Sequence, residues 1–143
     1  MKALTLTQPW ATLVAIGDKH IETRSWQTHY RGPLAIHAAK GIPKGARDWF
    51  LENNYASMVL AGQGVHWATD LYNLPRGMVI ATCTLADIER ADSTFVETLS
   101  DQEFAFGDYS EGRFAWHLTG VTMLPEPIPA KGSLGLWEWS EPK

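Results

Sequence analysis

Short segments in which apolar and polar residues alternate recur along this chain, separated by turns and by helical segments. The clearest one, Gly77 to Asp87, is rich in Met, Val, Ile and Thr, as β-strands typically are. Similar patterns predict strands at residues 3–7, 20–26, 34–40, 113–123 and 134–139. Because strands and helices do not alternate regularly, the pattern favours an α+β fold. We expect a small, mostly antiparallel β-barrel of about five or six strands with about three flanking helices.

The helices are expected at residues 9–16, 45–61 and 93–106, where apolar residues follow a helical period. Residues 62–76 look irregular. The segment PEPIPAKGS, residues 125–133, is predicted to be a loop, because proline cannot donate to a β-ladder.

The length of 143 residues predicts one domain, residues 1–143. No apolar run approaches the roughly 20 residues that span a bilayer, and we expect no membrane association. No secretion signal is visible at the N-terminus. The single cysteine, Cys83, lies in an apolar run and is predicted to be a buried core residue, which favours a reducing, cytoplasmic location.

Charge is distributed unevenly, although the net charge is only −4. Residues 1–47 carry seven basic and two acidic side chains, whereas residues 48–143 carry five basic and fourteen acidic ones. An acidic chain can therefore still present a basic surface. Chance clustering in a short chain explains the asymmetry equally well.

The stretch GDKHIETRSW, residues 17–26, concentrates charge on a predicted strand. Glu22, Arg24 and Trp26 lie two residues apart and therefore share one strand face. The Glu22 carboxylate can hold the Arg24 guanidinium in place. Lys19 precedes the strand, where its side chain is expected to reach freely. The alternative is a solvent-exposed strand face whose ion pair adds little stability.

Further candidate ligand-binding residues flank this strand. Arg31 and Lys40 lie at the start and end of the next strand or in its flanking turns, and Trp10 lies in the preceding helix. Cations oriented by a carboxylate beside an aromatic plane suit a phosphate and a stacked base. This chemistry indicates RNA, DNA or a nucleotide as the partner.

Other functional motifs are weak. The chain has no phosphate-binding glycine loop, no CxxC and no HExxH, so we expect no metal and no cofactor. His66 and Asp70, four residues apart, are more typical of a surface turn than of a metal site. The acidic segment 87–111 offers a surface for a protein partner, although a solvated helix and loop explains it better.

The residues from Gly17 to Arg24 fit the pattern GxKxxExR and resemble the ASCH domain family, which is similar in fold to PUA domains. Gln8–Ala11 (QPWA) precedes the pattern, as in the branch related to transcription coactivators. Tyr30–Gly32, Ile36–Lys40, Gly112–Trp116 and Lys131–Trp137 also look like family blocks.

This resemblance implies a β-barrel with helices around it and a cleft between them, lined by the GxKxxExR residues. It implies binding of RNA or another nucleic acid, or of a nucleotide, with a hydrolase acting in the same cleft as the alternative. If the chain is an enzyme, Lys19 and Glu22 are the candidate catalytic residues for ribonuclease chemistry or, less readily, for N4-acylcytidine hydrolysis. In the deacylating relatives a Thr nucleophile stands where this chain has Glu22. Thr23 is adjacent but belongs to the opposite strand face.

Overall fold

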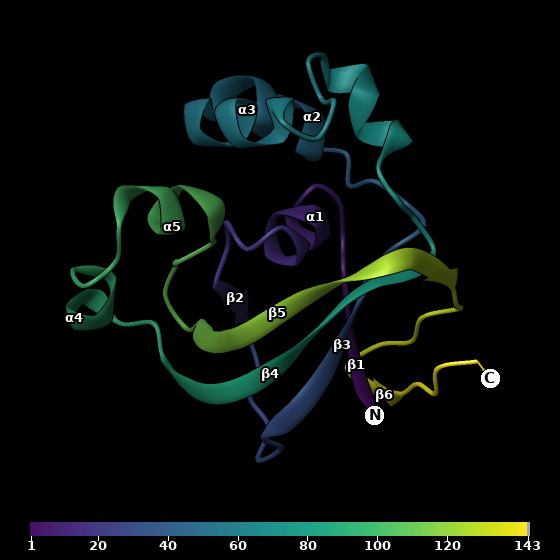
Figure 1. The fold of residues 1–143 in the computed structure, drawn as a ribbon. Helices are drawn as coiled ribbons and strands as arrows, with labels where there is room; N and C mark the ends of the chain where they lie inside the picture. The colour runs from purple at the N-terminus through teal and green to yellow at the C-terminus, as the bar shows by residue number, and fades with distance from the viewer. Residues whose placement is uncertain (143) are drawn as a thin grey trace.

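The computed structural model describes residues 1–142 and contains a curled, mixed sheet of six strands. Figure 1 shows the sheet as a half-barrel, with most of the helices gathered above one of its ends. The strand order is β2-β5-β4-β3-β1-β6. The strands are β1 (Lys2–Leu6), β2 (Ile21–Arg24), β3 (Gly32–Ala38), β4 (Met78–Arg90), β5 (Phe114–Pro129) and β6 (Leu136–Glu138). Only β1 and β3 pair in parallel, so the predicted α+β fold with a mostly antiparallel sheet is confirmed.

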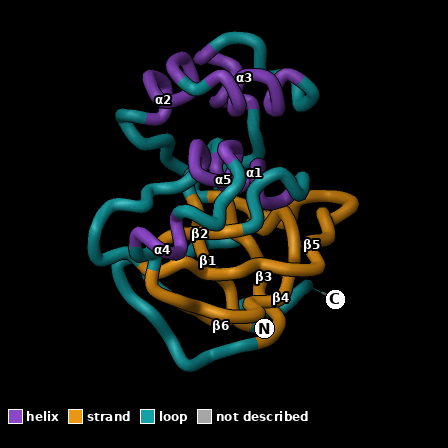
Figure 2. The backbone as a smooth tube through the Cα atoms, turned by 90° about the vertical axis from the view of Figure 1, so that its left-hand side faces the viewer, coloured by secondary structure: helices purple, strands orange, loops and turns teal. Residues whose placement is uncertain are grey.

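The helices are α1 (Trp10–Ala15), α2 (Ala46–Glu52), α3 (Asn54–Ala61), the 3-10 helix η1 (Ala68–Asn73), α4 (Ser93–Val96) and α5 (Asp101–Phe106). Helices α2, α3 and η1 form a layer above the half-barrel, whereas α4 lies beside the strands (Figures 1 and 2). Helix α1 lies between the sheet and this layer. Its Val14 packs into the barrel core beside Leu34 and Trp116, and its Leu13 packs into a second core with Phe50 and Leu60. One short helix thus joins the two halves of the molecule.

Two of the predicted helices are broken into pairs. The segment 45–61 divides at Asn53, whose side-chain oxygen accepts a hydrogen bond from the backbone N–H of Ala56 at 3.0 Å and so begins α3. Its amide nitrogen donates to the carbonyl of Ala105 at 2.8 Å. The segment 93–106 divides similarly, because the Ser100 side chain begins α5.

The prediction that residues 125–133 form no strand is wrong for 125–129. Strand β5 continues to Pro129, which pairs with Met78 at the start of β4. The prolines fit because the register shifts there. Val79 pairs with Ile128, whereas Ala81 pairs with Met123, so the residues between them need no regular ladder bonds.

The first strand, β1, and the last strand, β6, lie side by side in the half-barrel, and the N-terminus lies on its side away from the helices (Figure 1). The amino group of Met1 donates to the carbonyl of Trp139 at 2.6 Å. Strand β6 covers only the first half of β1, pairing Lys2, Ala3 and Leu4. The second half of β1 therefore has one edge free for side-chain contacts.

Candidate functional site

A cleft of about 670 Å³ lies where the end of the half-barrel meets the helices. Strands β1 and β2 supply one side, and helices α1, α2 and α5 supply the other. The residues lining the cleft are Thr5, Thr7, Trp10, Glu22, Thr23, Arg24, Ser25, Trp26, Trp49, Phe106, Gly107, Asp108 and Arg113.

The charged face of β2 points into this cleft as the alternation predicts. Ile21 and Thr23 are buried, whereas Glu22 and Arg24 are half-buried. Nη2 of Arg24 lies 3.0 Å from Oε2 of Glu22, so the predicted ion pair is confirmed. The same nitrogen donates to the carbonyl of Thr5 at 2.8 Å. Since β1 and β2 are not neighbours in the sheet, Arg24 bridges the open seam of the half-barrel.

A second arginine, Arg113, faces the cleft from the segment before β5. Its Nη2 donates to the carbonyl of Thr23 at 2.9 Å, and its Nε lies 3.8 Å from Oδ2 of Asp108. Hydrogen bonds from Ser110, and to a smaller extent the charge of Arg113, hold the pKa of Asp108 below its ordinary value. Sequence reasoning did not single out Arg113 or Asp108. The only signal was the family block Gly112–Trp116.

Both guanidinium groups retain unused hydrogen-bond donors. Among the described residues, Nη2 of each arginine donates to protein oxygens and Nη1 of each donates to none, whereas Nε of each is buried without a hydrogen-bond partner. Each group is therefore held in place through Nη2, while Nη1 remains for a ligand.

Lys19 does not reach freely from the turn, and that expectation is wrong. Its side chain is 1 % exposed and is not part of the cleft lining, and its Nζ donates to the carbonyl of Ile21. Burial lowers the pKa of Lys19, although the nearby carboxylates of Glu22 and Glu103 oppose the shift. Lys19 is thus a buried polar group at the start of β2 and not a residue of the cleft wall.

Glu103 of α5 is the other buried ionisable group at this place. Its Oε1 accepts a hydrogen bond from the backbone N–H of His20 at 2.7 Å, which ties α5 to the start of β2. Its Oε2 is buried with no hydrogen-bond partner in the described chain. Sequence reasoning placed Glu103 only within the acidic segment 87–111. Several carboxylates of that segment serve local structure instead, such as Asp92, which accepts from the N–H of Phe95.

Arg31 and Lys40 lie outside the cleft. Arg31 is exposed and donates to the carbonyls of Thr28 and Tyr30. Lys40 is exposed at the end of the segment that follows β3 and lines a different hollow. Within the cleft the lining holds two arginines and two carboxylates, so the expected cluster of cations is not present there.

Tryptophans form much of the cleft wall. Trp10 and Trp26, which the sequence offers as candidates to contact a ligand, both line it. The Trp10 ring lies 4.7 Å from the Trp49 ring, centroid to centroid, at an interplanar angle of 48°. Trp26 packs edge-on against the buried Trp116 at 4.8 Å. Trp49 of α2 also lines the cleft.

Other candidates from the sequence have local roles. Oδ2 of Asp70 accepts from the backbone N–H groups of His66 and Trp67, which fixes the turn before η1. Cys83 is buried as predicted, and burial raises the pKa of its thiol to about 12. Among residues 1–142 no three His, Cys, Asp or Glu side chains are arranged to hold a metal ion. No helix in the same range is long and apolar enough to cross a membrane.

The comparisons with known proteins agree with this architecture. The family model described as "ASCH domain" matches residues 4–128, most of the chain. The chain belongs to the ASCH domain family. The Activating signal cointegrator 1 proteins of Mus musculus and Homo sapiens are each 27 % identical to it over 135 residues. These matches cover 94 % of the chain and 22 % of each relative, so the chain spans about a fifth of their length. Their match agrees with the expected likeness to the coactivator branch.

The crystal structure of ASCH from Zymomonas mobilis shares the fold, with a TM-score of 0.56 and 15 % sequence identity. The superposition covers 98 % of this chain and 87 % of that one. This chain therefore has the same overall fold as that ASCH structure.

Proposed function

We propose that this ASCH domain binds a nucleic acid or a nucleotide and that the cleft receives a nucleobase. The observation that carries the proposal is the pair of anchored guanidinium groups, of Arg24 and Arg113, with unused donors beside tryptophan rings. Arginine donors suit the acceptors on a base edge, and indole rings suit its face. The family's association with nucleic-acid binding supports the same conclusion.

The two carboxylates of the cleft refine the kind of contact. Glu22 and Asp108 can only accept hydrogen bonds when ionised, so they suit the amino group or ring N–H of a base. They would repel a phosphate placed beside them. Because two carboxylates balance the two arginines of the lining, the cleft suits an uncharged nucleobase better than a phosphate. Its volume of about 670 Å³ is within the range of small-ligand pockets, roughly 300–1,000 Å³.

Binding of single-stranded RNA and of free nucleosides, measured by fluorescence anisotropy and calorimetry, tests the proposal. Arg113→Lys keeps the charge but loses the fork of donors, and Glu22→Gln keeps the shape but loses the carboxylate. Both should weaken binding about 5- to 150-fold, at about 1–3 kcal/mol for a lost base-edge contact. Arg47→Lys, at an exposed position of α2 outside the cleft, is the matched control. Equal affinities for all of these variants and the wild type would overturn the proposal.

A hydrolase acting in the same cleft is the second candidate. The observation that favours it is the Glu22 carboxylate in the cleft lining, which lies close enough to the buried Lys19 amine to oppose the lowering of its pKa. RNA cleavage needs no protein nucleophile, because the 2′-hydroxyl attacks. Incubation of labelled RNA and of N4-acetylcytidine with the wild type and with Glu22→Gln tests this candidate. Absence of turnover of both substrates by the wild type would remove it.

A further inference from the structure

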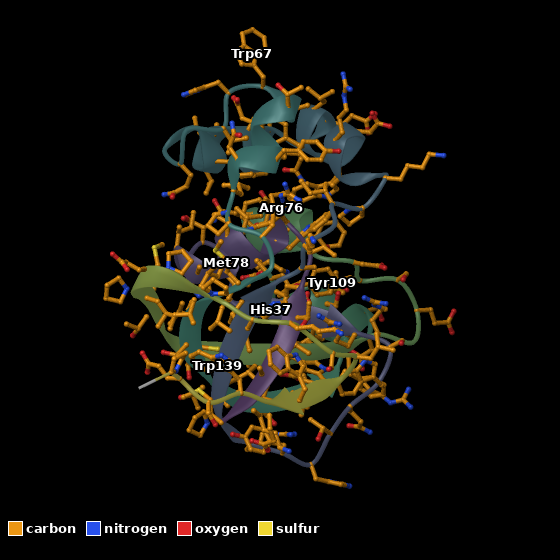
Figure 3. All side chains as sticks on the ribbon, turned by 90° about the vertical axis from the view of Figure 1, so that its right-hand side faces the viewer. His37, Trp67, Arg76, Met78, Tyr109 and Trp139 are labelled. Carbon is orange, nitrogen blue, oxygen red and sulfur yellow. The ribbon has the colours of Figure 1, made fainter. Side chains whose placement is uncertain are left out.

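A second hollow, of about 890 Å³, adjoins the cleft on the other side of β1. We call it the lysine groove, and its defining residues are Thr5, His37, Lys40, Lys131, Gly132 and Ser133. It is built where β3 ends, where β4 begins and where the chain leaves β5. Figure 3 labels His37 and Arg76, and both lie below the helical layer in that view.

The floor of the lysine groove is held in one arrangement by buried hydrogen bonds. His37 is 3 % exposed, and its Nε2 lies 2.7 Å from the carbonyl of Ala130. A carbonyl can only accept, so Nε2 carries the proton and Nδ1 accepts from the Thr5 hydroxyl, 3.1 Å away. That hydroxyl in turn accepts from the indole N–H of Trp137 at 3.1 Å. The chain at Gly132 lies directly against the His37 ring, with no room for a side chain.

The charges of the lysine groove differ from those of the cleft. Lys40 and Lys131 are both exposed on its rim, and no carboxylate oxygen of residues 1–142 forms an ion pair with either. Arg76 donates to the carbonyl of Lys40 at 2.6 Å and adds a third cation at the edge. The groove lining contains no acidic residue. An anion is therefore attracted here, whereas the cleft is balanced.

Thr5 joins the two sites. Its carbonyl accepts from Arg24 on the cleft side, and its hydroxyl bonds to His37 on the groove side. It lines both hollows, so a ligand that crosses this one residue enters both. A nucleic-acid strand presents bases and phosphates next to each other along its length, and it needs partners of both kinds.

We propose that the lysine groove binds the phosphodiester backbone of a single-stranded nucleic acid whose base occupies the cleft. Lys40 and Lys131 then neutralise the phosphates of the strand, which lie outside the cleft. The inference rests on the proposed function of the cleft and narrows it, because the ligand is an oligonucleotide rather than a free nucleoside. RNA and DNA have the same phosphodiester groups. The lysine groove is therefore expected to bind both and not to distinguish them by the 2′-hydroxyl.

The test compares the double variant Lys40→Gln/Lys131→Gln with the control Lys44→Gln, an exposed lysine outside both hollows. The probes are labelled RNA and DNA oligonucleotides of about ten nucleotides, within the usual site sizes of about 4–16. Free cytidine and adenosine report on the cleft alone. All three lysines are exposed, so the variants should fold, which urea unfolding checks.

We expect the double variant to bind both oligonucleotides more weakly and to bind the nucleosides as the wild type does. Two lost phosphate contacts reduce the slope of log affinity against log salt by about 1.4, at about 0.7 per contact for single strands. Between about 50 and 200 mM salt the wild type then loses about sevenfold more affinity than the double variant does.

Two results overturn the inference, and they differ in what else they overturn. If the double variant keeps the oligonucleotide affinity and salt slope of Lys44→Gln while Arg113→Lys loses binding, the groove proposal fails and the cleft proposal stands. If the wild type binds neither oligonucleotides nor nucleosides, both fail. An effect on RNA but not on DNA would show that the lysines do more than hold a phosphodiester and would also overturn the inference as stated.

Discussion

Replacing Gly132 by alanine should destabilise the protein because the added methyl group has no space. Its Cβ would lie 2.7 Å from Cε1 and 2.8 Å from Nδ1 of His37, and 2.8 Å from Oγ1 of Thr5. Carbon atoms in contact are normally about 3.5–4.0 Å apart. Neither neighbour can yield freely, since His37 is buried between two hydrogen-bond partners and Thr5 also accepts from Trp137.

The size of the effect follows from these contacts. Overpacking a filled site costs about 1–3 kcal/mol, and displacing the His37 ring breaks a hydrogen bond worth about 0.5–1.5 kcal/mol. We therefore expect the free energy of unfolding to fall by about 2–4 kcal/mol. For a chain of this size that lowers the thermal midpoint by about 5–15 °C, at about 2–4 °C per kcal/mol.

Urea unfolding followed by tryptophan fluorescence measures the change. Gly41→Ala is the matched control, because nothing lies within 4 Å of the position of its added Cβ and its backbone is not left-handed. That control should stay within about 0.5 kcal/mol of the wild type. In a His37→Ala background the cost of Gly132→Ala should shrink, since the obstructing ring is gone. A Gly132→Ala protein as stable as Gly41→Ala would refute the reasoning.

Three further predictions concern the side chains of Lys19, Cys83 and Asn53. Burial lowers the pKa of Lys19, so between that pKa and the ordinary value of 10.5 the unfolded chain holds one more proton and stability rises with pH. The stability of the wild type relative to Lys19→Met should therefore increase as the pH approaches 10.5 in urea titrations, and a constant difference would contradict the shift. The Cys83 pKa is raised from 9.0 to about 12, so the unfolded chain loses its proton first and stability is lost as pH rises above 9. Cys83→Ala should lose less stability than the wild type between pH 9 and 12, and parallel losses would argue against a buried thiol. Asn53→Ala removes both the cap of α3 and the bond to Ala105 and should cost about 1–3 kcal/mol, whereas Asn53→Asp keeps the cap and should cost less. Thermal unfolding of the two Asn53 variants decides this, and equal losses would mean that the cap contributes little.

Local periodicity explains why the fold class and the face of β2 could be predicted. A strand places every second side chain on the same side, whatever surrounds it, so Glu22 and Arg24 share a face. In the structure Nη2 of Arg24 lies 3.0 Å from Oε2 of Glu22. The break at Asn53 was not predictable in this way. Its amide bond to Ala105 joins residues 52 positions apart, and no helical period records such a contact.

The remaining site residues depend on the same kind of long-range contact. Arg113 reaches the cleft because β5 pairs with β2 and brings Arg113 to the carbonyl of Thr23, 90 positions away. Lys19 is buried because α5 folds over the start of β2 and Glu103 bonds to the backbone of His20. From the sequence alone, a lysine after a glycine turn looks exposed. The family resemblance located the region of the site, but not which side chains face the cleft.

The adjacency of the two chain ends has a consequence for how the domain can be joined to other proteins. Met1 contacts Trp139, and both ends lie on the part of the half-barrel remote from the helical layer (Figure 1). A host protein can therefore accept the domain within a surface loop without stretching that loop. An insertion of this kind leaves the cleft, which lies at the end of the half-barrel that meets the helices, away from the points of attachment.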